Sequence, residues 1–133
     1  MILLDTHVAL WLTADSSSLG KRSRWTAKHA AASDQLAISA VSFWEIALLI
    51  AKSRLRPPET AQAMRRRILG EGAIELPLTG EIAILAAELE GLHGDPADRF
   101  IAATAIAHNA TLITADERLL SWRHALRRQN AEV

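Results

Sequence analysis

Four acidic side chains have the type and placement needed for chemistry on a metal ion. Asp5 and Asp116 each follow a short apolar run, Asp98 closes an Asp-Pro-Ala-Asp segment, and Glu45 interrupts an apolar stretch. The chain has no cysteine, which excludes disulfides, thiolate catalysis and zinc–sulfur sites. Carboxylate oxygens favour hard cations such as Mg²⁺ and Mn²⁺. If these side chains converge, metal-assisted hydrolysis is the expected chemistry.

Glu45 is the acid that local structure explains least. On a helix its i−4, i+3 and i+4 neighbours are Val41, Leu48 and Leu49, so it is expected to point with an apolar stripe. A buried carboxylate needs a cation, a hydrogen-bond network or a raised pKa. Pairing with a single Arg or Lys is the alternative to metal binding.

The aspartates each have a structural alternative, because Asp is favoured at helix N-caps and in first helical turns. That alternative applies to Asp5, Asp98 and Asp116. Asp95 precedes Pro96, which favours a helix start, and it is predicted to be an N-cap that supports the site. Four carboxylates within a few ångströms persist only when divalent cations neutralise them. Such a cluster suits two-metal phosphodiester hydrolysis, in which the ions lie about 3.5–4 Å apart.

Hydroxyl and imidazole side chains stand close to the proposed ligands. Thr6 and Thr114 could orient a carboxylate or a metal-bound water, although strand-end or capping roles fit them equally well. His7 and His93 are weaker candidates for metal ligation, because a lone histidine beside a turn is usually structural.

Short apolar runs separated by helical patterns define the predicted architecture. Strands are expected at 2–4, 36–38, 73–76 and 112–113, with a weak fifth strand in the polar tail 127–133. Helices are expected around 8–12, 21–32, 39–54 (ending near Arg54 and the Pro57-Pro58 pair), 59–69, 79–89, 96–107 and 119–122. This alternation predicts an α/β fold with three α/β/α layers and a four- to five-stranded parallel sheet. Ligands of such sheets lie beyond the carboxyl ends of the strands, where the three aspartates stand.

Length and composition indicate one domain spanning residues 1–133, with half of the positions apolar. No signal peptide is apparent, and the longest apolar stretch, residues 36–51, is shorter than the roughly 20 residues of a membrane span. We therefore expect a cytoplasmic protein without membrane contact.

The formal net charge is zero, so a polyanionic ligand would need local positive patches. Basic clusters lie at 21–24, 65–67 and 123–128. The cluster at 65–67 is one candidate to flank an RNA path. Solvated helix faces are the simpler interpretation of all three clusters.

Four segments together resemble the PIN-domain ribonucleases, specifically the VapC-type toxins of bacterial toxin–antitoxin pairs. They are Leu-Leu-Asp-Thr-His-Val-Ala-Leu-Trp at 3–11, Ile-Ser-Ala-Val-Ser-Phe-Trp-Glu-Ile-Ala at 38–47, His-Gly-Asp-Pro-Ala-Asp-Arg-Phe-Ile-Ala at 93–102, and Thr-Leu-Ile-Thr-Ala-Asp at 111–116. Each motif alone is weak, but the four occur in the expected order over nearly the whole chain. Two features depart from the usual pattern: Ala97 stands where a bulky aromatic is common, and the last strand is hard to see.

The resemblance implies that Asp5, Glu45, Asp98 and Asp116 form an acidic metal site with Thr6 and Thr114 in support. It further implies endonucleolytic cleavage of RNA with Mg²⁺ or Mn²⁺, a homodimer, and inhibition by a cognate antitoxin. The apolar side chains expected to offer part of the antitoxin groove, or else to pack in the core, are Trp11, Trp44, Leu48 and Leu49.

Two other functions fit parts of the sequence. A phosphoacceptor or phosphatase also uses an aspartate after the first strand, but it needs a lysine near a late strand, and the lysines Lys21, Lys28 and Lys52 all lie in the first half. The second alternative is a catalytically inactive PIN-like module that binds RNA or protein. The presence of all four acids disfavours it.

Overall fold

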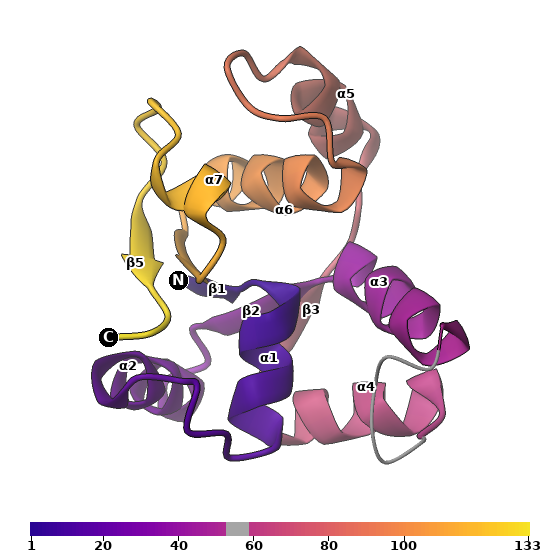
Figure 1. Cartoon of the computed structure of the whole chain (residues 1–133), viewed down its shortest axis with the longest axis vertical. Coiled ribbons are helices and arrows are strands. Elements are labelled where there is room, and N and C mark those ends of the chain that lie inside the picture. The colour runs from indigo at the N-terminus through magenta and orange to yellow at the C-terminus, as the bar shows by residue number, and fades with distance from the viewer. Residues whose placement is uncertain (53–58) are drawn as a thin grey trace.

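Figure 1 shows the computed structural model, in which residues 1–52 and 59–133 are described. The strands are β1 (Ile2–Leu4), β2 (Leu36–Ser39), β3 (Ile74–Leu76), β4 (Thr111–Thr114) and β5 (Arg128–Asn130). The helices are α1 (Thr6–Thr13), α2 (Lys21–Ala32), α3 (Ala40–Ala51), α4 (Ala61–Gly70), α5 (Gly80–Glu88), α6 (Pro96–Ala107) and α7 (Glu117–Leu120). The predicted helix end near Arg54 and Pro57-Pro58 lies outside the described residues.

The five strands form one parallel sheet in the order β3-β2-β1-β4-β5. The central strand β1 pairs with β2 on one side and with β4 on the other, so that Leu4 lies beside both Ile38 and Ile113. This register brings the carboxyl ends of β1 and β4 level with each other. The predicted α/β class with a parallel sheet is confirmed.

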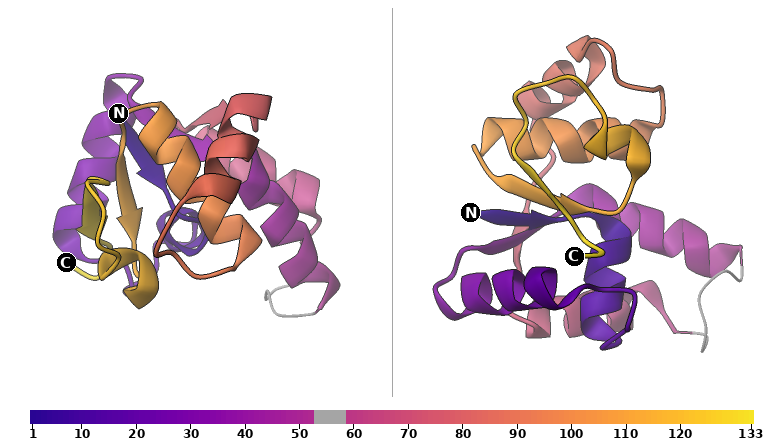
Figure 2. Two further views of the ribbon diagram at one scale, coloured as in Figure 1. Left: turned by 90° about the horizontal axis from the view of Figure 1, so that it is seen from above. Right: turned by 60° about the vertical axis from the view of Figure 1, so that its left-hand side comes forward.

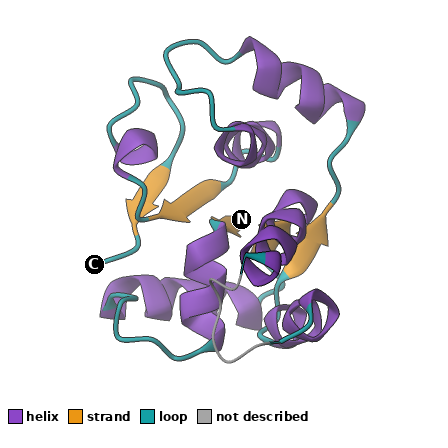
Figure 3. Cartoon of the chain, turned by 45° about the vertical axis from the view of Figure 1, so that its right-hand side comes forward, coloured by secondary structure: helices purple, strands orange, loops and turns teal. Residues whose placement is uncertain are grey.

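Helices cover both faces of the sheet, as the views in Figures 2 and 3 show. Successive side chains of a strand point to opposite faces. Leu3 and Leu112 accordingly belong to the core beneath α5 and α6, whereas Leu4 and Ile113 belong to the core shared with α1, α2 and α4. Burial on both faces explains why these strands read as continuous apolar runs.

The fifth strand forms although its Arg-Gln-Asn sequence has no apolar residue. It pairs with β4 through the register Ile113 to Gln129, which completes the larger of the two predicted sheet sizes. The helix expected at 119–122 lies two residues earlier, at Glu117–Leu120, and Trp122 lies beyond its end. Among the described residues, the helices are all too short or too polar to cross a membrane.

The chain changes direction across the sheet between β1 and β4. From β1 it runs outward to β2 and β3, and it then returns to place β4 on the other side of β1. The connections that leave β1 and β4 therefore diverge to opposite faces, with α1 on one side and α7 on the other (Figure 2). Open parallel sheets bind their ligands at such a switch point.

Candidate active site

Asp5 lies immediately after β1, in the crevice between the ends of β1 and β4, and only 8% of its surface is exposed. It caps α1, because one carboxylate oxygen accepts the backbone N–H of Thr6 at 2.8 Å. The other oxygen accepts the hydroxyl of Thr114, the last residue of β4, at 2.6 Å. Burial raises the pKa of Asp5, and these two hydrogen bonds offset only part of the increase.

Glu45 projects from α3 and is held by the hydroxyl of Thr6, which donates to its Oε1 at 2.5 Å. The same Thr6 hydroxyl hydrogen-bonds to the Ser42 hydroxyl at 2.9 Å. Burial raises the pKa of Glu45, against the Thr6 hydrogen bond, and the neighbouring Asp5 raises it further. The predicted apolar stripe holds only in part, because Leu48 on the same helix face is 36% exposed.

Asp116 caps the short helix α7 and is the one acid of the four whose pKa is lowered. Its Oδ1 accepts the backbone N–H groups of Arg118 at 2.8 Å and of Leu119 at 3.3 Å. Its Oδ2 lies 3.1 Å from the Arg118 guanidinium. Burial acts to raise the pKa of Asp116, but the hydrogen bonds and charge of Arg118 outweigh it.

Asp98 lies in the first turn of α6, where its backbone N–H donates to the predicted N-cap Asp95 at 3.3 Å. Its side chain is buried, with 7% of the residue exposed. Burial and the charges of Asp5, Asp95, Asp116 and Glu45 raise the pKa of Asp98 to about 7. A carboxylate destabilised in this way favours the arrival of a cation.

All four acids line one cavity of about 340 Å³ at the carboxyl edge of the sheet. The other lining residues are His7, Trp11, Asp95, Ala115 and Arg118. The structure thus brings together the four predicted carboxylates and Asp95, and it places Thr6 and Thr114 directly behind them as hydrogen-bond donors. Within the described residues the most compact donor group is Asp98, Asp116 and His93, whose nearest ligand atoms all lie within 4.8 Å of one another.

The donor set fits a hard divalent cation. Three of the four carboxylates have raised pKa values, so binding of a cation would relieve their burial and mutual repulsion. His93 lies beside Asp98. Its Nδ1 accepts the backbone N–H of Asp95 at 3.3 Å, and its buried Nε2, which has no hydrogen-bond partner among the described residues, lies 3.3 Å from Asp98 Oδ2.

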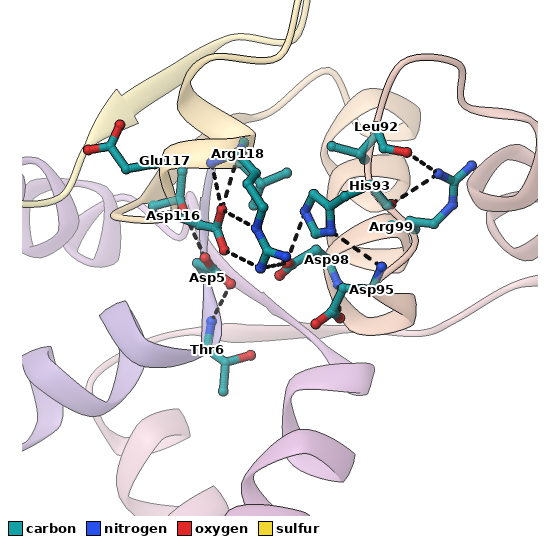
Figure 4. A network of polar contacts seen from close by, with 12 residues as sticks. Asp5, Thr6, Leu92, His93, Asp95, Asp98, Arg99, Asp116, Glu117 and Arg118 are labelled. Carbon is teal, nitrogen blue, oxygen red and sulfur yellow. Dashed lines mark hydrogen bonds and ion pairs between the residues drawn. The ribbon is translucent and has the colours of Figure 1, made fainter.

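Two arginines in the site region were not predicted from the sequence. Arg118 contacts both Asp98 and Asp116 (Figure 4), and only its position two residues after Asp116 hinted at this. Arg99 donates hydrogen bonds to five backbone carbonyls, those of Ala86, Ala87, Leu89, Leu92 and His93. It holds the end of α5 and the segment that carries His93. Of the predicted Arg65–Arg67 run, Arg65 pairs with Glu75 and Arg67 with Glu59.

Comparisons with known proteins agree with this fold. The PIN domain family model matches residues 2–123. Ribonuclease VapC22 of Mycobacterium tuberculosis is 37% identical over 124 residues, which is 92% of each chain. The crystal structure of VapBC2 from Rickettsia felis bound to a DNA fragment from their promoter matches with a TM-score of 0.70 and 22% identity, over 98% of each chain. A toxin–antitoxin complex from Klebsiella pneumoniae matches with a TM-score of 0.62 and 23% identity, over 92% of this chain and 93% of that one. At those identities the two structures show the fold alone. The family model and the 37% identity to VapC22 show that this chain belongs to the PIN-domain family, among its VapC-type members.

Proposed function

We propose that the chain is a metal-dependent endoribonuclease that hydrolyses RNA phosphodiester bonds at Asp5, Glu45, Asp98 and Asp116, using Mg²⁺ or Mn²⁺. The observation that carries the proposal is the single cavity that these four carboxylates line at the switch point of the sheet. The family and the name of the 37% identical relative support the choice of RNA as substrate.

The side chains around the cavity hold the acids in place. Thr114 and the Thr6 backbone fix the two oxygens of Asp5, the Thr6 hydroxyl fixes Glu45, and His93 Nε2 lies 3.3 Å from Asp98 Oδ2. A bound divalent cation would supply an activated water and charge stabilisation for the leaving oxygen. Among the described residues, those lining the cavity offer no hydroxyl, thiol or amine nucleophile. Direct hydrolysis by water therefore fits better than attack by a serine, cysteine or lysine side chain.

An antitoxin partner follows from the same resemblance. Solved structures with this fold include toxin–antitoxin complexes. Beside the acidic cavity a second cavity of about 300 Å³ is lined in part by Trp44, Leu48, Leu49 and Ala97. Trp44 is 52% exposed, so this side chain does not pack in the core, and an antitoxin segment could cover it. The homodimer and the cytoplasmic location remain predictions.

The alternatives are weaker. A phosphoacceptor would need a lysine at the site, but Lys21 and Lys28 lie on α2, Lys52 follows α3, and none of them lines the acidic cavity. An inactive RNA- or protein-binding module would not need four converging carboxylates.

The test is cleavage of RNA by the purified chain with Mg²⁺ or Mn²⁺, and with excess chelator. We expect cleavage only with metal, and loss of at least a hundredfold in rate for Asp5→Asn and Asp98→Asn with the fold retained, within the range that electrostatic stabilisation supplies, roughly 10²–10³. Asp34→Asn is the matched control, because Asp34 is an exposed residue in the turn after α2. Cleavage at an unchanged rate in either variant, or in chelator, would refute the proposal. Glu45→Gln is expected to weaken metal binding in calorimetry, and an unaltered titration would return Glu45 to a structural role.

A further inference from the structure

Arg118 places a permanent positive charge beside the acids of the cavity. Its NH2 nitrogen lies 3.1 Å from Asp116 Oδ2 and 3.5 Å from Asp98 Oδ2, as Figure 4 shows. The guanidinium therefore bridges two acids that belong to different helices, α6 and α7. The pKa of Arg118 is raised by Asp116, so the group stays charged at every accessible pH.

The two acids that Arg118 contacts belong to the most compact donor group of the site. Metal–oxygen distances for Mg²⁺ are about 2.0–2.1 Å, well below the distances from these oxygens to the guanidinium nitrogen. An ion shared by Asp98 and Asp116 would therefore lie against a like-charged group. Metal binding there would compete with the contacts of Arg118.

Arg118 is free to leave. Its side chain is 58% exposed, so water screens its attraction to the two acids. The guanidinium also borders a neighbouring cavity of about 430 Å³, whose other lining residues are Gly91, His93, Ser121, Trp122 and Arg123. Rotation of the side chain toward that cavity would break the contacts with both acids while the backbone cap of α7 stays in place.

The neighbouring cavity has the chemistry for an anion. Arg118 and the exposed Arg123 both line it, and guanidinium groups bind phosphate through paired N–H donors. It adjoins the acidic cavity, with which it shares Arg118. A nucleic acid cleaved at the acids would extend past it.

We infer that Arg118 is the counter-ion of Asp98 and Asp116 in the metal-free protein, that a divalent cation displaces it, and that the displaced guanidinium binds an RNA phosphate beside the cleaved bond. Arg118 in this view couples metal binding to RNA binding. The inference rests on the proposed function for the identity of the polyanion.

The first test is calorimetric titration of Mn²⁺ into the wild type, Arg118→Ala and Arg123→Ala. Because the competing cation is gone, Arg118→Ala is expected to bind Mn²⁺ about threefold to fivefold more tightly, the modest effect expected when one partner of the ion pair is exposed. Arg123→Ala removes the same charge without touching either acid, and it should stay within a factor of about 1.5 of the wild type. Equal or weaker binding by Arg118→Ala, or the same tightening in both variants, would overturn the displacement.

The second test measures binding of a single-stranded RNA oligonucleotide with Mn²⁺ present, in an Asp5→Asn background that blocks cleavage. Adding Arg118→Ala should weaken RNA binding. The slope of log affinity against log salt should become shallower by about one unit, as expected for the loss of one phosphate contact. An unchanged slope would contradict the RNA contact. If the wild type cleaves RNA with metal, but Arg118→Ala changes neither Mn²⁺ binding nor RNA binding, only this inference is refuted. A chain that binds no Mn²⁺ in any form refutes both the inference and the proposed function.

Discussion

The Thr114 hydroxyl donates a 2.6 Å hydrogen bond to Asp5 Oδ2 across 109 residues of sequence. The contact exists because β1 and β4 are neighbours in parallel register, with Leu4 beside Ile113, so that the residues following each pair also meet. Thr114 also accepts the backbone N–H of Asp116 at 3.0 Å. One hydroxyl therefore ties together the two acids that follow the strands at the switch point.

Thr114→Val should damage the site more than the fold. The variant keeps the side-chain shape but removes the donor to Asp5 and the acceptor for Asp116, and a lost hydrogen bond to a charged group costs about 1.5–3 kcal/mol. We expect weaker Mn²⁺ binding in calorimetry and RNA cleavage at least tenfold slower. Thr114→Ser should restore most of both, and Thr111→Val, at the other end of β4, is the matched control. Full activity in Thr114→Val would contradict this role.

Arg99 should prove essential for stability. Its guanidinium donates to five backbone carbonyls between Ala86 and His93. A lysine has one nitrogen and cannot reach the same set. We expect Arg99→Lys to lower the free energy of unfolding by about 2–4 kcal/mol in urea titrations, since each bond to a charged donor contributes about 1.5–3 kcal/mol and lysine retains some of them.

Arg66→Lys on the exposed face of α4 is the control for Arg99→Lys and should change the unfolding free energy by less than about 0.5 kcal/mol. Equal stabilities of the two variants would show that the α5–α6 turn holds without the guanidinium.

Much of the fold and the acidic site could be predicted from local sequence. Short apolar runs revealed the first four strands of the chain, and the acids after two of them indicated the site. Arg118 was missed because its partner Asp98 lies 20 residues earlier on another element. The helix face beside Glu45 was misjudged, because periodicity shows which residues share a face but not whether another element covers it. Leu48 shares that face and remains partly exposed.

Asp98 predicts how stability depends on pH in metal-free protein. Its pKa is about 7 in the folded chain against an ordinary value of 3.8, so between these values the folded state holds a proton that the unfolded chain has released. Unfolding then releases protons, and stability falls as pH rises from about 4 to above 7. At about 1.4 kcal/mol per pKa unit, the total fall from this group is on the order of 4 kcal/mol. Denaturation in chelator at pH values of about 4.5, 6 and 8, which span this window, measures it.

Asp98→Asn should flatten that profile, because an amide does not titrate. In the wild type, Mg²⁺ should restore the stability that is lost above pH 7, because it binds the ionised Asp98 carboxylate. Asp34→Asn should keep the wild-type slope. Parallel profiles for wild type and Asp98→Asn would show that Asp98 does not titrate in this range.

The fifth strand depends on a close approach of backbone that side-chain patterns do not reveal. The Gly20 N–H donates to the Ala131 carbonyl at 2.8 Å, and a Cβ at Gly20 would collide with the carbonyl group of Val133. Since the φ of Gly20 is −65°, its replacement is opposed by this contact rather than by backbone strain. Gly20→Ala must push the tail away from α2, and overpacking of this kind costs about 1–3 kcal/mol.

Gly70→Ala is the control, because nothing lies within 4 Å of the point that its added methyl group would occupy. We expect Gly20→Ala to lose stability in urea titration and to expose the Ala131 amide to hydrogen exchange, while Gly70→Ala does neither; equal protection in both variants would show that β5 is held by its pairing with β4 alone.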